Sequence, residues 1–261
     1  MSDNERIHST AIIAPGAEIA DDAKIGPYVV IGADVSIGSG TDIRSHCVVK
    51  GPTRIGSNNH IYSFASIGDD PQDKKYAGEP TRLEIGDGNT IREYCTINRG
   101  TTQDEGLTAI GDDNWLMAYS HVAHDCRVGS HTIMANGATL GGHAHVEDYA
   151  MLSAFSAVHQ FCRIGAHSFV GAYGGINQNI PPYVMVFGQP PAARGINSEG
   201  LRRRDFSADQ IRNLKGAYKI IYRSGLRLAE AREALAALAP EQSELAILIE
   251  FLDKSDRGIL R

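Results

Sequence analysis

An aliphatic residue stands at every sixth position through most of the first 180 residues. The series runs from Ile13 to Ile67, returns from Ile85 to Ile97, and continues without a break from Ile110 to Ile176. An amphipathic helix repeats about every 3.6 residues and sandwich strands roughly every 8–12, so neither fits this spacing. A fixed short repeat is typical of a solenoid. We therefore predict a mainly β fold, a parallel β-helix of six-residue repeats in which short strands alternate with corners.

The repeat also predicts which residues lie above one another. If the cross-section is triangular, one coil takes eighteen residues, and successive coils stack about 4.8 Å apart. We call the aliphatic residues of the six-residue repeat its anchors. Each cysteine stands four positions after an anchor, at a position that Ala, Ser and Thr occupy in other repeats: Cys47, Cys95, Cys126 and Cys162. We interpret them as small core side chains rather than nucleophiles. Since no CxxC pair is present, a zinc knuckle and a redox motif are disfavoured.

Two segments interrupt the repeat, residues 68–84 and residues 98–109. Loops that leave a rigid scaffold are favoured places for binding residues. The first segment carries Gln72, Asp73 and Lys75, so we interpret it as a candidate binding loop. An ordinary solvated loop is the alternative interpretation.

The repeat ends at Pro181–Pro182, which predicts a β-helix domain over residues 1–190 and an α-helical domain over residues 191–261. Ser207 and Gln210 have the spacing of a capping box, and helices are predicted over about 207–224, 228–238 and 242–254. Residues 194–227 contain nine Lys or Arg but only three Asp or Glu. This basic stretch indicates a dock for a polyanion or an acidic partner, with a solvated helix face as the alternative.

The formal net charge of −6 argues against a general nucleic-acid coat, which needs a strongly basic face. The first ten residues contain no apolar leader, and no run of about 18 apolar residues occurs, so membrane insertion is not expected. We expect a soluble cytoplasmic protein.

Histidines concentrate in three predicted coils: His121, His124, His143, His145 and His159. A zinc carbonic anhydrase built on such coils has histidines five positions apart, a spacing absent here, so no metal is predicted. The eighteen-residue register instead places Gly142 above His124. An imidazole can take a proton from an attacking hydroxyl while a backbone N–H one coil away meets the oxyanion. This arrangement is suited to acyl transfer.

Five segments resemble, in order, motifs of the acyl-[acyl-carrier-protein]–UDP-N-acetylglucosamine O-acyltransferase family: PQDKKYAGEPTRLEIG, SHVAHDCRVG, AVHQFCRIGAH, PPYVMVFGQPPAARGINSEGLRRRDFS and AYKIIYRSG. The resemblance covers essentially the whole chain. It implies a left-handed β-helix, a homotrimer with sites between subunits, and no cofactor. The implied reaction moves a (3R)-3-hydroxyacyl chain from acyl carrier protein to the 3-hydroxyl of UDP-N-acetylglucosamine, the first step of lipid A biosynthesis.

The resemblance also implies roles for individual residues. His124 would be the general base and Gly142 the oxyanion donor. Asp73 and Lys75 match loop residues that contact the sugar and substrate. Apart from the resemblance, either Asp73 or Asp125 could orient the imidazole, and we expect Asp73, because neighbours on a strand face opposite sides. The implied substrate-binding residues are Gln72, Lys75, His121, His143, His159, Gln160, Asn197, Glu199, Arg203 and Arg204. The last four match uridine diphosphate contacts made by a neighbouring subunit.

Other functions stay open at this point. The acceptor could carry a 3-amino group in place of the 3-hydroxyl, since both present a nucleophile at the same place. The related glucosamine N-acyltransferase of the same pathway typically has an additional N-terminal domain, whereas here the repeat begins by Ile13. A non-enzymatic β-helix scaffold should show flat threonine arrays rather than convergent histidines.

Overall fold

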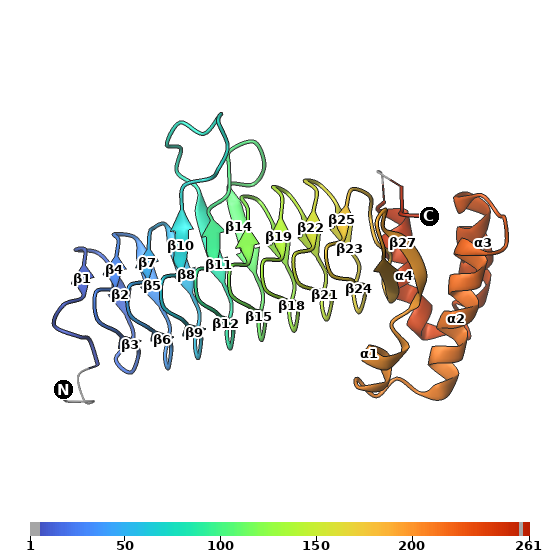
Figure 1. Ribbon diagram of the computed structural model, residues 1–261, viewed down its shortest axis with the longest axis horizontal. Helices are drawn as coiled ribbons and strands as arrows, with labels where there is room; N and C mark the ends of the chain where they lie inside the picture. Colours follow the sequence, from blue (N-terminus) through green and yellow to red (C-terminus); the bar gives the residue numbers. More distant parts are fainter. Residues whose placement is uncertain (1–5, 256–257) are drawn as a thin grey trace.

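The computed structural model describes residues 6–255 and 258–261, and most of it is the predicted parallel β-helix (Figure 1). Three sheets form its sides, and successive strands of the chain enter them in turn. The first sheet contains β1 (Ile12–Ile13), β4 (Val30–Ile31), β7 (Val48–Val49), β10 (Ser66–Asp69), β13 (Thr96–Asn98), β16 (His121–Val122), β19 (Thr139–Leu140), β22 (Ala157–Val158) and β25 (Gly175–Ile176). The second sheet contains β2 (Glu18–Ile19), β5 (Val35–Ile37), β8 (Thr53–Ile55), β11 (Arg82–Ile85), β14 (Leu107–Ile110), β17 (Arg127–Val128), β20 (His145–Val146) and β23 (Arg163–Ile164). The third sheet contains β3 (Lys24–Ile25), β6 (Asp42–Ile43), β9 (His60–Ile61), β12 (Thr90–Ile91), β15 (Trp115–Leu116), β18 (Ile133–Met134), β21 (Met151–Leu152), β24 (Phe169–Val170), β26 (Val184–Phe187) and β27 (Ala192–Ile196).

The six-residue anchors form the core of the β-helix, as predicted. From Ile25 to Ile176 every anchor is at most 4% exposed. The four cysteines are each 0% exposed and lie in the same core. Away from the two interruptions, the strands pair in the predicted eighteen-residue register, for example His121 with Thr139. The sequence prediction of the fold is confirmed.

At most corners of the prism, the third residue after the anchor has a positive φ. Asp125 has φ 59° and His143 has φ 60° at equivalent corners of adjacent coils. This left-handed backbone is uncommon outside glycine, asparagine and aspartate. On an extended strand two neighbouring side chains point to opposite sides, whereas at such a corner they can point toward each other.

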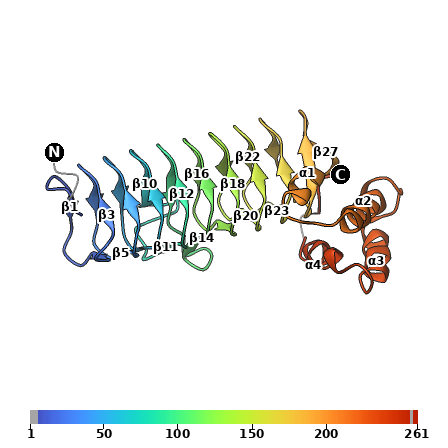
Figure 2. The same cartoon turned by 90° about the horizontal axis from the view of Figure 1, so that it is seen from below.

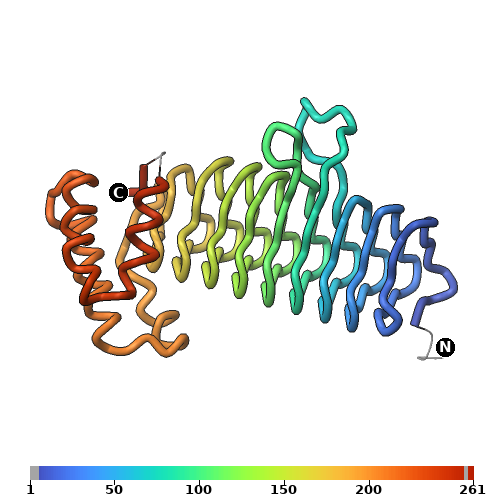
Figure 3. The backbone as a smooth tube through the Cα atoms, turned by 180° about the vertical axis from the view of Figure 1, so that it is seen from behind, coloured from blue at the N-terminus to red at the C-terminus, as the bar shows by residue number. Residues whose placement is uncertain are grey.

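Both interruptions of the repeat leave the prism at one edge (Figures 1 and 3). The first excursion, residues 70–81, connects β10 to β11, and the second, residues 99–106, connects β13 to β14. Each runs from the first sheet to the second sheet, so both occupy the corner between those sheets. They contact each other, since Gln103 Nε2 donates to Asp73 Oδ2 over 3.1 Å.

The β-helix ends in an antiparallel hairpin of β26 and β27, and helices follow: α1 (Ser198–Arg202), α2 (Ala208–Tyr222), α3 (Leu228–Leu238), a 3-10 turn (Ser243–Leu245) and α4 (Ala246–Asp253). Figure 2 shows these helices beyond the last coils. They share a second apolar core, with Leu214 and Phe251 each 1% exposed. The predicted capping box of Ser207 and Gln210 is confirmed. The domain boundary after residue 190 stays a prediction and falls in the turn of the hairpin.

No helix in the described ranges is long and apolar enough to cross a membrane.

Candidate active site

His124 lies at the corner that follows β16, and its side chain is 13% exposed. Its Nδ1 atom is 2.8 Å from Asp125 Oδ2. Because an ionised carboxylate only accepts, Nδ1 carries the proton and Nε2 is left as the basic nitrogen. A Cβ atom added to Gly142 would lie 2.7 Å from His124 Nε2. The predicted stacking of Gly142 over His124 is therefore confirmed.

Asp125, and not the predicted Asp73, holds the imidazole of His124. The prediction assumed that adjacent residues face opposite sides, as they do on a strand. His124 and Asp125 instead lie in the turn beyond the strand, where the positive φ of Asp125 brings its carboxylate back to the imidazole. Asp73 lies in the first excursion, where it accepts from Lys75 N over 3.0 Å and from Gln103. These bonds, with the nearby His124, lower the pKa of Asp73.

Asp125 is almost completely enclosed, with 1% of the residue exposed. Its Oδ1 accepts from Thr101 N over 2.8 Å, and its Oδ2 accepts from Thr101 Oγ1 over 2.6 Å. Burial opposes its ionisation, but the hydrogen bonds from His124 and Thr101 outweigh it and hold the pKa of Asp125 below its usual value. Asp125 is thus an ionised partner for the imidazole.

Gly142 and His143 form the equivalent corner one coil further on. In the described part of the chain, no acceptor is paired with the Gly142 N–H. The His143 ring is perpendicular to that of His124 with centroids 5.2 Å apart, and it stacks on Phe161 at 4.5 Å. Its Nδ1 is 3.1 Å from Asp104 Oδ2. A free N–H and two imidazoles therefore meet at one corner.

His121 points outward from β16, where its Nδ1 is 2.7 Å from Thr96 Oγ1. Burial lowers the pKa of His121, so this imidazole stays neutral at neutral pH. Gln72 and Lys75 are exposed on the first excursion, and Lys75 Nζ reaches Gln103 Oε1 at 3.4 Å. His159 and Gln160 are exposed one coil beyond His143.

The four residues predicted to contact uridine diphosphate lie on another corner, between the second and third sheets. Asn197 caps α1 through Gly200 N and donates to His167 O over 3.0 Å. Glu199 is paired with Arg202 and Arg203 on the surface. The Arg204 guanidinium lies 5.0 Å over the Tyr149 ring. Within one chain, these residues and His124 are not brought together.

Sequence reasoning missed three residues of the second excursion and its neighbourhood. Thr101 binds Asp125, and Asp104 lies beside Nδ1 of His143. Arg99 is 6% exposed and binds Gly68 O, Asp70 and Tyr76, which fastens the first excursion to the second. The sequence indicated only that these residues lie in an interruption of the repeat. The eighteen-residue register predicts neighbours for residues of the repeat, so it could not predict the partners of these three.

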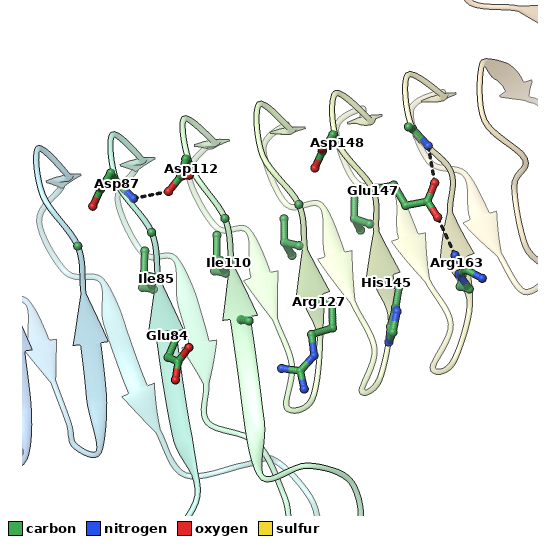
Figure 4. A pocket seen from close by; sticks show the side chains of 18 of the residues that line it. Glu84, Ile85, Asp87, Ile110, Asp112, Arg127, His145, Glu147, Asp148 and Arg163 are labelled. Atoms are coloured by element: carbon green, nitrogen blue, oxygen red, sulfur yellow. Dashed lines mark hydrogen bonds and ion pairs between the residues drawn. The ribbon is translucent and has the colours of Figure 1, made fainter. Parts of the chain in front are cut away.

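A surface groove of about 810 Å³ follows the second sheet to α4 and does not include His124. Figure 4 shows Arg127, His145 and Arg163 projecting from its successive strands. A smaller groove of about 440 Å³ contains Asp104 and His143. We assign the chemistry to the smaller groove, because it adjoins the paired imidazole and carboxylate.

A metal ion is the other candidate occupant of this corner. Among the described residues, His124, Asp125 and His143 offer ligand atoms within 4.8 Å of one another. However, both oxygens of Asp125 already accept hydrogen bonds, and Nδ1 of His124 is one of the donors. The prediction that the site needs no metal stays a prediction.

A prism of six-residue repeats with an imidazole and a carboxylate paired at one corner defines the class of hexapeptide-repeat acyltransferases. The family described as bacterial transferase hexapeptide (six repeats) matches residues 16–51 and 108–142, and the one described as UDP N-acetylglucosamine O-acyltransferase, domain 2, matches residues 179–260.

The chain is 56% identical to the acyl-[acyl-carrier-protein]–UDP-N-acetylglucosamine O-acyltransferase of Thiobacillus denitrificans over 98% of this chain and 99% of that protein. It is 54% identical, over the same shares, to the one of Saccharophagus degradans. The solved UDP-N-acetylglucosamine O-acyltransferase of Moraxella catarrhalis superposes with a TM-score of 0.97 at 48% identity, covering 98% of this chain and 100% of that one. The chain belongs to the acyl-[acyl-carrier-protein]–UDP-N-acetylglucosamine O-acyltransferase family, and it is an acyltransferase.

Proposed function

We propose that the protein transfers a (3R)-3-hydroxyacyl chain from acyl carrier protein to the 3-hydroxyl of UDP-N-acetylglucosamine, the first step of lipid A biosynthesis, in the cytoplasm. The observation that carries the proposal is the His124–Asp125 pair beneath the free N–H of Gly142. The family relatives are named for these two substrates.

The chemistry needs a base and an oxyanion donor. Nε2 of His124 takes the proton from the sugar hydroxyl as its oxygen attacks the thioester carbonyl carbon. The Gly142 N–H stabilises the resulting oxyanion. When the intermediate collapses, the carbon–sulfur bond breaks and the imidazolium returns its proton to the thiolate. The charge on Asp125 stabilises the imidazolium between the two steps.

A covalent acyl-enzyme is not part of this mechanism. Cys126, the nearest thiol in sequence, is 0% exposed and donates to Gly141 O over 3.2 Å. Burial raises the pKa of Cys126 to about 12, so the thiolate that a nucleophile requires is absent at neutral pH.

We further propose that the protein is a homotrimer in which Asn197, Glu199, Arg203 and Arg204 of a neighbouring subunit bind uridine diphosphate. Two observations support this proposal. The four residues lie at a corner apart from His124 of the same chain, and Arg203 is exposed there with a guanidinium fork that suits a diphosphate. Five exposed aromatic rings also follow one another along the edge between the third and first sheets, with the last four stacked: Tyr28, His46, Phe64, Tyr94 and Tyr119. An apolar edge of that length is suited to packing against another copy.

The acyl carrier protein would dock on α2. A stripe of exposed basic side chains at helical spacing runs along α2 and its C-cap residue: Arg212, Lys215, Lys219 and, at the cap, Arg223. A basic stripe complements an acidic carrier protein, and such contacts steer association in a salt-dependent way.

The test is an assay with purified protein, a panel of 3-hydroxyacyl carrier thioesters, and UDP-N-acetylglucosamine or its 3-amino analogue. We expect O-acylation and loss of about a hundredfold or more in kcat for His124→Ala, which should fold normally. Full activity of His124→Ala, or exclusive use of the amino sugar, would contradict the proposal. Sedimentation of the same samples tests the trimer, and a fully active monomer would exclude it.

A further inference from the structure

Three donors converge on the two carboxylate oxygens of Asp125, and two of them belong to Thr101. Thr101 N donates to Oδ1 over 2.8 Å, and Thr101 Oγ1 donates to Oδ2 over 2.6 Å. The third donor is Nδ1 of His124, on the same Oδ2 atom at 2.8 Å. The direction of the carboxylate, and therefore of the imidazole, depends on a residue 24 positions earlier in the chain.

Thr101 itself has little freedom. It is 2% exposed, and its carbonyl oxygen accepts from Asp104 N at 3.2 Å and Gly106 N at 3.1 Å. The chain before it is equally confined, because a Cβ atom on Gly100 would collide with Leu107 N and lie 2.8 Å from Asp125 Oδ1. The second excursion thus folds tightly around Thr101 and presents its hydroxyl to Asp125.

The other side of Asp125 is fixed by the coil. Asp125 N donates over 2.8 Å to Oγ1 of Thr108, which lies in β14 of the preceding coil. Backbone and carboxylate are therefore both held, and the side chain of Asp125 is 0% exposed. At that depth the Thr101 hydroxyl shares Oδ2 with His124 Nδ1 as a hydrogen-bond donor, while His143 Nε2 lies further away, 3.7 Å from the same oxygen. The hydroxyl therefore influences how much negative charge Oδ2 presents to His124.

We propose that Thr101 is a positioning residue for acyl transfer: its hydroxyl fixes the Asp125 carboxylate so that His124 keeps its proton on Nδ1 and its lone pair on Nε2. The inference rests on the proposed role of His124 as general base. Thr101 does not touch the substrate, so its loss lowers kcat while the KM values for both substrates change little. Removing one hydrogen bond to a buried charge should lower kcat about 10–100-fold.

A pH profile separates positioning from a merely structural role. Without the hydroxyl, the negative charge of Asp125 is less stabilised, so the His124–Asp125 pair binds a proton more readily. The acid limb of kcat/KM should therefore move to higher pH. The other ionisable groups that face this pair are His121, His143 and Asp73, with Asp104 beyond His143, and all four remain in the variants.

The experiment compares Thr101→Val, which removes the hydroxyl at constant shape, with Thr101→Ser, which restores it. Thr102→Val, an exposed position on the same excursion, controls for effects on the loop. We expect a 10–100-fold loss of kcat for the valine variant, near wild-type turnover for serine, and no effect at residue 102. If Thr101→Val does not fold, Thr101→Ala takes its place with the same expected outcomes.

A double-mutant cycle completes the test. In an Asp125→Asn background, Thr101→Val should cause no further loss, because Thr101 acts through the carboxylate. An equal loss in both backgrounds overturns the inference, and so does a valine variant within about threefold of wild type. His124→Ala is measured in parallel. If it is inactive while Thr101→Val is fully active, the inference fails and the general-base proposal stands, whereas an active His124→Ala removes the general base itself.

Discussion

Replacing Asp125 with asparagine is the sharpest test of the paired imidazole and carboxylate. The two oxygens of Asp125 serve three donors, Thr101 N, Thr101 Oγ1 and His124 Nδ1. Asparagine has the same shape but offers one acceptor oxygen and one NH2 donor. If its oxygen stays with Thr101 N, the NH2 group faces the proton on His124 Nδ1. The imidazole must then lose this partner or move its proton to Nε2, where it can no longer act as the base.

The expected loss of kcat in Asp125→Asn follows from the catalytic groups that the variant retains. The Gly142 N–H and the substrate contacts are unchanged, so only the general-base contribution disappears, which is typically worth about 10²–10⁴ in rate. At about 1.36 kcal/mol per factor of ten, this raises the barrier by roughly 2.7–5.4 kcal/mol. The unsatisfied donor also costs about 1–3 kcal/mol of folding free energy, which a melting curve will detect. We expect kcat to fall and both KM values to stay within a few-fold.

The assay is thiol release at saturating concentrations of both substrates, with circular dichroism and sedimentation confirming the fold. Asp73→Asn is the informative comparison, because the sequence alone favours Asp73 as the orienting carboxylate. Its partners are Lys75 N and Gln103 on the excursions, so we expect a loss below about tenfold. An Asp125→Asn enzyme within about threefold of wild type, or a larger loss for Asp73→Asn, would refute the assignment.

Four further changes test other parts of the structure. Cys126→Ser should remain active, and mass spectrometry of enzyme incubated with acyl donor alone should find no acyl adduct, because this thiol is buried with a pKa of about 12. Arg204→Ala should raise the KM for the nucleotide sugar about tenfold or more, since hydrogen bonds to charged groups are worth roughly 1.5–3 kcal/mol; an unchanged constant removes it from the site. Lys219→Glu should raise the KM for the acyl carrier protein and reduce its salt dependence, while the constant for the nucleotide sugar stays the same. Burial lowers the pKa of His167 to about 4, so the unfolded chain takes up a proton near pH 6.5 while the folded chain does not. The free energy of unfolding should therefore decrease as the pH is lowered from about 6.5 to about 4. Melting temperatures of His167→Phe should show a smaller fall over the same range.

The fold was predictable because the repeat constrains every coil in the same way. Each anchor from Ile25 to Ile176 is buried, and the eighteen-residue register places Gly142 over His124 as predicted. The capping box at Ser207 fixed the start of α2 for a similarly local reason. The boundary between the parts was harder to place, because β27 continues the third sheet past the prolines that end the repeat.

The site was predictable only where it coincides with the repeat. His124 and Gly142 are coil residues, so their register could be counted. The partner of His124 could not, because it depends on the positive φ of Asp125 in a turn that strand alternation does not describe. Asp104 reaches His143 across 39 positions, through an excursion whose path no periodicity determines.

The supports of the catalytic pair come from outside the repeat for a physical reason. His124, Gly142 and Gln160 occupy the same corner position in successive coils, as do Asp125, His143 and Phe161 one residue later. The prism therefore offers nearly the same backbone at each of these corners, and a corner alone leaves its side chains open to water. Both excursions are inserted at this edge, in the two preceding coils, and the second brings Thr101 to Asp125. A buried, ionised carboxylate and an imidazole of fixed tautomer thus arise at this coil because the second excursion supplies hydrogen-bond donors that the repeat lacks.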